Sequence, residues 1–348
     1  MLENLLRGID ATEINAFARA VQTPADYALT LSVMPERTIN SVKFRIRSTS
    51  RRVNAAKYRA WDAQTAVATR EAKRIVTEGM LPPLGQKYLV GELEQILLDT
   101  SRGADDSELV ELLYQDIAAH VQSIKSRLEL AVGDLLTDGK FTLAGENGLT
   151  VEYDAGVPSA NMPTATKAWT DPTADALKDE MAWIETLRAS GAPLPSRVVT
   201  SYKARALLAA NNSYRQAFYG SIPANTPTGV LAPNEVDTVR ARYGLPPISV
   251  YDVQIPKDDG TMVRPIPEDR WLMLPPNPQT WGETQYGVTA ESLVLSSGGN
   301  PAIEREEAPG IVVTHGYTDD PVQVWTKGAA VAMPVLYVPD IHVTAKVF

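Results

Sequence analysis

The sequence contains no cysteine among its 348 residues. A disulfide framework, a thiol nucleophile and a thiolate metal site are therefore excluded. It also contains no run of about 18 apolar residues, and its first residues lack the basic segment that precedes the apolar core of a secretory signal. We expect neither a membrane span nor a signal peptide, and these absences together predict a protein that is made and kept in the cytosol.

Histidine is scarce as well. His120, His315 and His342 lie far apart, and none has a second ligand at the spacing that metal sites use. The segment Ser296–Gly299 lacks the helix and the triad context of a nucleophile elbow or a phosphate loop, so it is interpreted as a mobile surface loop. We therefore expect no catalytic residue, no metal site and no cofactor.

The chain is acidic overall, with a net charge of −9, and 44% of its residues are hydrophobic. This length and composition allow a sizeable core, which we expect to be divided between two or more lobes. The negative charge argues against sequence-specific DNA binding by the whole surface.

One stretch, Arg37–Arg74, has the opposite charge. It contains eleven basic and two acidic residues, a net charge of +9, so the rest of the chain carries −18. The stretch can be interpreted as a solvated loop, as a patch that contacts phosphates, or as an arm that docks on another copy of the chain. The acidic remainder favours the third interpretation, since a basic arm gains attraction and register on an acidic neighbour.

Residues 1 to about 35 are predicted to form short helical pieces. Asp10 and Glu13 have the spacing of a capping box, and Ile14, Phe17 and Val21 form one apolar stripe. Such short helices need a surface to dock on. We expect neighbouring subunits to supply it, so that this segment is mobile in the free subunit and becomes ordered on assembly.

The next segment, residues 41–85, is predicted to leave the body and return to it. From Val42 to Arg47 apolar and basic residues alternate, which predicts a strand with one apolar and one basic face. The segment ends in the rigid turn Leu81–Gly85.

The clearest helix is predicted from Ser107 to Asp138. Its apolar residues recur at steps of three and four, and Asp138-Gly139 ends the pattern. This gives roughly 48 Å of helix, long enough to act as a lengthwise strut. Further elements are predicted as a hairpin over 141–153, a helix ending near Ser190, a buried strand over 197–200, a helix over 202–210, and a terminal strand over 341–348.

Several motifs resemble those of a known family. Tyr58–Ala63 and Gly79–Gly85 resemble the loop of the major capsid protein E family, the lambda-like head proteins of tailed bacteriophages, which have the Hong Kong 97 capsid fold. Further similar segments follow in order through the chain: Leu135–Lys140, Val151–Asp154, Trp169–Asp171, Leu274-Pro275, Gly282, Tyr286–Thr289, Pro309-Gly310 and Asp320-Pro321.

The resemblance implies an α+β fold and a division of the chain into parts. These are an N-arm (1–40), an extended loop that lies over a neighbouring subunit (41–85), a peripheral domain (86–192) with its spine helix (107–138), an axial domain (193–325), and a terminal strand that returns to the peripheral domain (326–348).

It also implies a shell protein without an active site, which builds an icosahedral head around double-stranded DNA. Its expected partners are further copies in hexamers and pentamers, a portal, a scaffold or protease, and a decoration protein. We expect its place to be the virion, assembled in the cytoplasm of a host bacterium. The candidate contacts between subunits are Arg45, Arg47, Arg51, Arg52, Lys57, Arg59 and Trp61.

Two other functions remain open on the sequence. The same fold could form an encapsulin-like compartment that stores cargo enzymes, although the long N-arm counts against it. A soluble hydrolase with an unrecognised site is the other alternative.

Overall fold

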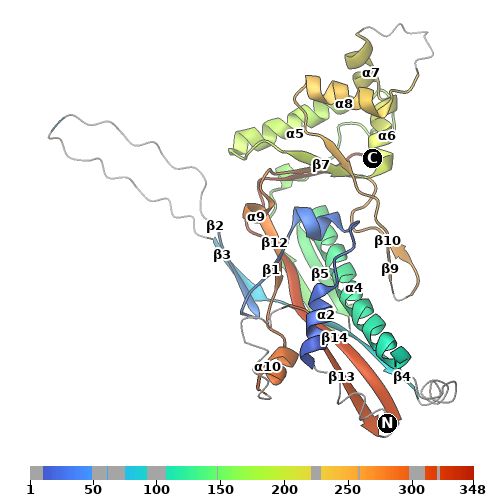
Figure 1. The fold of residues 1–348 in the computed structure, drawn as a ribbon. Helices are drawn as coiled ribbons and strands as arrows, with labels where there is room; N and C mark the ends of the chain where they lie inside the picture. The colour runs from blue at the N-terminus through green and yellow to red at the C-terminus, as the bar shows by residue number, and fades with distance from the viewer. Residues whose placement is uncertain are drawn as a thin grey trace.

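The computed structural model describes residues 11–48, 61, 75–91, 107–146, 148–220, 229–257, 259–297, 310–319 and 322–348. These residues form two parts placed end to end (Figure 1). The lower body is built on the long helix α4 (Ser107–Asp138), and the upper lobe is built on a four-stranded sheet.

Helix α4 is observed with the bounds that the sequence predicted. Ile117, Val121 and Ile124 on its apolar stripe are buried, which fixes the face that it turns to the sheet. The helix packs on a five-stranded sheet in the order β1-β12-β14-β13, with β4 also paired to β14. The strands are β1 (Glu36–Thr38), β4 (Pro83–Val90), β12 (Gly282–Tyr286), β13 (Val312–Asp319) and β14 (Val322–Leu336).

Short elements complete the lower body. The predicted hairpin is present as β5 (Lys140–Glu146) and β6 (Leu149–Asp154), and Gly145 and Gly148 in its turn have positive φ angles of 72° and 81°. The helices α9 (Pro278–Trp281) and α10 (Ala290–Ser297) also lie here, with the small hairpin of β9 (Ile255–Pro256) and β10 (Met262–Val263). The 3-10 turn η2 (Ser159–Asn161) contacts the upper lobe instead.

The upper lobe places helices over one face of its sheet. The strand order is β15 (Val343–Lys346), β11 (Arg270–Leu274), β7 (Arg197–Thr200) and β8 (Ile248–Val250). The helices are α5 (Ala176–Ser190), α6 (Tyr202–Ala210), α7 (Asn212–Tyr219) and α8 (Pro233–Arg242). Val198 packs with the helices, whereas the next residue, Val199, packs into the core of the lower body. The alternating faces of β7 therefore contact two cores, which explains why both of its valines are buried.

The end of the chain differs from the expectation that residues 326–348 return to the part with the spine helix. Strand β14 does lie in the lower body, but the chain then crosses over and β15 pairs with β11 in the upper lobe. Val343, Ala345 and Val347 alternate toward the core beneath α5–α8, and their burial there explains the crossing. In addition, β12, β13 and the first residues of β14 fall within 193–325, yet they belong to the sheet of the lower body.

The N-terminal helix also differs from the expectation of a mobile arm. Helix α2 (Ala11–Ala20) packs on α4 and β13 of its own chain. Ile14 and Ala18 are only 1% and 3% exposed, and they share a core cluster with Ile117 and Val121. The docking surface that a short helix needs is thus present in the single chain, and residues 1–10 lie outside the described residues.

Candidate assembly surface

A ribbon of two strands leaves the side of the lower body (Figure 1). Strands β2 (Lys43–Ser48) and β3 (Ile75–Met80) pair antiparallel, with Lys43 opposite Met80 and Ser48 opposite Ile75. On β2, Phe44 and Ile46 are buried and Lys43 and Arg45 are exposed. The predicted strand with one apolar and one basic face is confirmed.

The apolar face anchors the ribbon to its own chain. The ring of Phe44 meets the ring of Tyr153 edge to face, with centroids 5.3 Å apart. A Cβ atom at Gly79, on the paired strand, would lie 2.7 Å from the Phe44 ring. Only glycine leaves room for this contact, so Gly79 and Phe44 together fix the direction in which the ribbon leaves the body.

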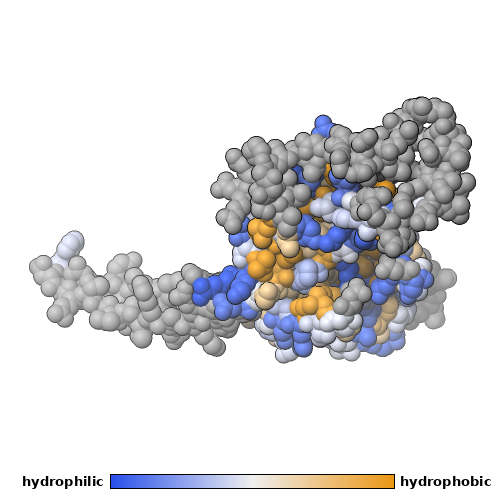
Figure 2. Space-filling model, turned by 90° about the horizontal axis from the view of Figure 1, so that it is seen from below, coloured by the Kyte–Doolittle hydropathy of each residue, from blue (hydrophilic) through white to orange (hydrophobic). Residues whose placement is uncertain are grey.

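The opposite face of the ribbon remains available to a partner. Lys43 is exposed, and Arg45 Nε lies 3.7 Å from the carboxylate of Glu78. The side chains of Arg45 and Glu78 are 57% and 69% exposed. An exposed ion pair of this kind contributes only about 0–1 kcal/mol. Arg45 can therefore exchange this contact for one with a neighbouring subunit at little cost. Figure 2 shows the base of the ribbon as a hydrophilic region at the side of the lower body.

The structure describes only part of the predicted contact set. Arg45 lies on the exposed face of β2, and Arg47 lies on the same strand, with its side chain outside the description. Trp61 is 97% exposed. The other four predicted residues, Arg51, Arg52, Lys57 and Arg59, lie outside the described residues.

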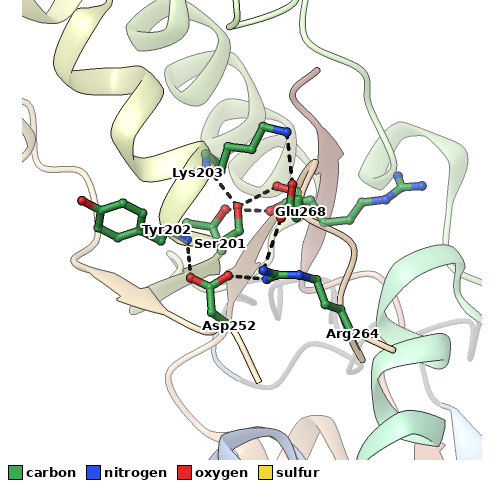
Figure 3. Close-up of polar contacts among 9 residues, drawn as sticks. Ser201, Tyr202, Lys203, Asp252, Arg264 and Glu268 are labelled. Carbon is green, nitrogen blue, oxygen red and sulfur yellow. Dashed lines mark hydrogen bonds and ion pairs between the residues drawn. The ribbon is translucent and has the colours of Figure 1, made fainter. Parts of the chain in front are cut away.

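A charged network in the upper lobe joins the start of α6, the residues after β8 and the loop between β10 and β11 (Figure 3). Arg264 pairs with both Asp252 and Glu268, and Lys203 reaches the second oxygen of Glu268 at 3.1 Å. The hydroxyl of Ser201, the N-cap of α6, donates to the main-chain oxygen of Glu268 at 2.7 Å. These contacts hold the start of α6 against neighbouring loops, and the serine hydroxyl is committed to that role.

A second polar cluster is buried beneath the helices of the upper lobe. Arg240 Nη1 lies 2.8 Å from both oxygens of Glu180, and the hydroxyl of Tyr214 donates to Glu180 at 2.5 Å. Arg240 also donates to the Pro246 oxygen and lies over the Trp271 ring at 5.3 Å. Burial raises the pKa of Glu180, and the positive charge of Arg240 opposes that rise. The cluster binds α5, α7 and α8 into one layer.

Two of the three histidines, His120 and His342, are buried in contacts between elements. His120 is buried and its Nε2 lies 3.0 Å from Thr326 Oγ1, while His342 accepts from the Trp281 indole at 3.3 Å. Burial lowers the pKa of both rings, for His342 to about 4. Among the described residues no group of His, Asp and Glu has the arrangement of a metal site, and no described helix has the length and apolarity to cross a bilayer.

A pocket of about 330 Å³ lies between α4, β5 and the residues around the β9–β10 hairpin. Charged side chains of both signs line it, namely Arg127, Asp134, Lys257 and Arg264. Burial raises the pKa of Asp134, whose carboxylate accepts from the Thr142 main-chain nitrogen at 3.1 Å. The mixed charges and the committed carboxylate do not point to one class of ligand.

One group of residues was missed by the sequence analysis. Glu129 on α4 is fully buried and accepts hydrogen bonds from Thr30 and Tyr251, which lie 99 and 122 residues away. The only signal in the sequence is a charged residue directly after Leu128 on the apolar stripe of the helix.

The profile of the family described as phage major capsid protein E matches residues 10–347 of this chain. The chain belongs to this family. The match covers nearly the whole sequence and confirms the resemblance found in the motifs. No curated protein sequence matches the chain.

Solved structures with similar folds include a protein named as a prophage capsid protein from Escherichia coli CFT073, with a TM-score of 0.62, 14% identity, and coverage of 98% of this chain and 99% of that chain. A phage-related protein from Bordetella bronchiseptica RB50 has a TM-score of 0.56 and 12% identity, with 96% of this chain and 95% of that chain covered. An encapsulin complex from Synechococcus elongatus has a TM-score of 0.47 and 12% identity, over 94% of this chain and 88% of that chain.

At these identities the structural likeness shows the fold alone. That fold is the α+β Hong Kong 97 capsid fold, as expected. Membership of the capsid protein E family identifies the chain as a major capsid protein of a tailed bacteriophage, a structural protein of the virion that assembles with itself into the icosahedral head. The encapsulin alternative is not favoured, because the family match is to phage capsid proteins.

Proposed function

We propose that the β2–β3 ribbon carries the extended loop of one subunit onto the next, and that this contact between copies holds the shell together. The observation that carries the proposal is the two-faced ribbon. Its apolar face is held by Phe44 in its own chain, while Lys43 and Arg45 face outward. The stretch that contains them has a net charge of +9, and the acidic remainder of a second copy complements it.

The rest of the molecule is assigned by position. The upper lobe, with its sheet β15-β11-β7-β8, is the axial domain, where subunits meet around symmetry axes. The lower body is the peripheral domain, and α4 is its spine. Residues 41–85 are the extended loop, and the N-arm is reduced to residues before α2, since α2 docks on its own chain.

The function is mechanical rather than catalytic. The head is closed around double-stranded DNA, which the shell contacts without sequence preference, and it is assembled in the cytoplasm of the host bacterium. We propose a portal, a scaffold or protease, and a decoration protein as its further partners. We propose that Arg51, Arg59 and Trp61 also take part in the contact between copies.

The test is expression of the chain alone, followed by electron microscopy. We expect closed shells or flat hexamer lattices from the unchanged protein. The double variant Lys43→Glu, Arg45→Glu reverses two exposed charges, so it should raise the protein concentration needed for assembly about five- to thirtyfold, from about 1–2 kcal/mol per contact. Circular dichroism should be unchanged, because neither side chain is buried.

The matched control is Lys178→Glu, Arg188→Glu, which reverses the same charge on the exposed face of α5. We expect the control to assemble at nearly the original concentration. Equal loss of assembly in both variants would assign the effect to net charge, and normal assembly of the ribbon variant would contradict docking by the basic face.

A further inference from the structure

The segment between α2 and β1 lies where the lower body meets the upper lobe. It first follows α4: Lys125 Nζ donates to Thr23 Oγ1 at 2.6 Å, and the hydroxyls of Tyr27 and Ser126 are 2.6 Å apart. It then forms the single π-helical turn η1 (Leu29–Val33). A π-helical turn is rare, and such turns occur frequently at functional sites.

The side chain of Glu129 holds this turn. Its Oε1 accepts from Leu29 N at 2.9 Å and from the Tyr251 hydroxyl at 2.7 Å. Its Oε2 accepts from Thr30 N at 2.9 Å and from Thr30 Oγ1 at 2.7 Å. The two main-chain donors belong to the start of the turn, where N–H groups have no partner within the helix. All four donors are neutral groups.

The same carboxylate reaches the upper lobe through Tyr251. This residue directly follows β8, and its main-chain nitrogen donates to the Thr200 oxygen at 2.8 Å. Burial and the neighbouring Glu129 raise the pKa of Tyr251, so its hydroxyl remains a donor. Arg197 on β7 adds a second link, donating to Ser32 O at 2.6 Å and to Ser32 Oγ at 3.0 Å. Two strands of the upper sheet are thus tied to the N-terminal segment.

Two further hydrogen bonds cross the junction, from Thr344 Oγ1 to Leu136 O at 2.7 Å and from the Trp281 indole to His342 at 3.3 Å, and much of the other contact is apolar. Val199 and Leu272 of the upper sheet share one core cluster with Leu135 and Leu136 of α4. Burial of apolar surface holds the parts together, but it is non-directional and so sets their relative angle weakly. Hydrogen bonds to a buried carboxylate require a defined geometry, because each donor must approach within about 3 Å and along its own axis.

The N-terminal segment also leads into the assembly surface. After η1, Thr284 Oγ1 donates to Met34 O at 3.0 Å, and β1 then pairs with β12. Ile39 N donates to Tyr286 O at 2.7 Å, and β2 begins at Lys43. A shift of η1 is therefore carried directly to the base of the β2–β3 ribbon.

We infer that Glu129 is a positioning residue for assembly: its carboxylate joins the N-terminal segment, the spine helix and the upper lobe, and so fixes the angle between the two parts and the exit of the ribbon. The inference rests on the proposed function, since the angle matters through the shape of the shell. A subunit that lacks this link keeps its core, but the angle between the lower body and the upper lobe is no longer fixed. The shells that it forms then vary in size.

The first variant is Tyr251→Phe, which removes one donor and keeps the ring. Its matched control is Tyr153→Phe, because Tyr153 is also buried and its hydroxyl donates to Leu336 O at 3.4 Å, within the lower body. We expect the amides of Leu29 and Thr30 to exchange about tenfold faster in Tyr251→Phe and at the original rate in the control. The diameters of assembled particles should spread only in Tyr251→Phe.

A second variant keeps the test independent of one substitution. Thr30→Val removes the Oγ1 donor and should speed exchange at Leu29. Because both variants act through one carboxylate, the double variant should change exchange by less than the product of the two single effects. Independent effects would overturn the role of Glu129 as the link, and so would unchanged exchange at Leu29 and Thr30 in Tyr251→Phe.

Exchange is measured below the concentration at which shells form, so its outcome does not depend on assembly. Unchanged exchange with normal shells would overturn the inference alone. Absence of shells from the unchanged protein would overturn the proposed function, and faster exchange in Tyr251→Phe would then still support the link between the two parts.

Discussion

Two buried glutamates hold two regions of this molecule in different ways. In the upper lobe, Glu180 is paired with the cation of Arg240 and with Tyr214, all within one helical layer. At the junction, Glu129 accepts only from neutral donors, and these come from segments about 100 residues away on either side. The first arrangement neutralises a charge and makes a rigid layer, whereas the second links separate parts of the chain.

The difference suggests which region tolerates change. A buried ion pair loses most when one partner is removed, because the other charge is left without compensation. A carboxylate with several neutral donors loses about one hydrogen bond per substitution, on the order of 1 kcal/mol each. We therefore expect the upper layer to respond to substitution by unfolding, and the junction to respond by a change of geometry.

The largest effect is expected for Arg240→Met. It leaves Glu180 fully buried without its cation, which should cost about 3–5 kcal/mol and lower the urea midpoint sharply. The double variant Glu180→Leu, Arg240→Met removes both charges and should recover more than half of the loss, since an apolar pair of similar volume fills the site. A double variant no more stable than Arg240→Met would show that the packing, rather than the charge, holds the layer.

The second largest effect is expected at low pH, where the protein should lose stability through His342 at the junction. Full burial lowers the pKa of His342 to about 4, below the value of about 6.5 in an unfolded chain. The folded state thus disfavours the proton, so this contribution is complete above pH 6.5 and is lost as the pH falls toward 4, about 3 kcal/mol in all. The pKa of Glu180 is raised instead, so protonation of that group does not destabilise the upper layer as the pH falls.

The variant His342→Gln tests this, because glutamine keeps an acceptor for the Trp281 indole but does not titrate in this range. We expect its melting temperature to fall less between pH 7.5 and pH 4.5 than that of the unchanged protein. His120 is present in both proteins and cancels in the difference, and His315→Gln serves as the control on β13. Equal acid sensitivity of all three would contradict a role for His342.

Local patterns in the sequence predicted local structure well. The spacing of apolar residues gave α4 with both ends correct, and strict alternation gave the two faces of β2. Both signals depend on neighbours a few residues apart, which a single sequence contains. The family resemblance then supplied the arrangement of the whole fold, which these local patterns cannot provide.

Contacts between distant segments could not be predicted in the same way. The apolar alternation from Ile341 correctly indicated a strand, but it is equally compatible with either sheet, and only pairing with β11 decides between them. The stripe on α2 indicated that a partner surface was needed, not that α4 of the same chain supplies it. The partners of Glu129 are similarly invisible, because no local pattern relates it to Thr30 or Tyr251.

The smallest effect is expected from a third carboxylate, which is exposed. Glu78 contacts Arg45 at 3.7 Å on the ribbon, so Glu78→Gln should change the stability of the subunit by less than about 0.5 kcal/mol. It also makes the exposed face of the ribbon more positive. If this face docks on an acidic neighbour, the concentration needed for assembly should fall about two- to fivefold, by light scattering at low salt, and the gain should shrink as salt is added. The control Glu152→Gln removes a similar exposed carboxylate, 4.0 Å from Lys140 on the β5–β6 hairpin, and should leave that concentration nearly unchanged. An increase for Glu78→Gln would mean that the ribbon meets a basic surface, and the sign of the proposed docking would then be wrong.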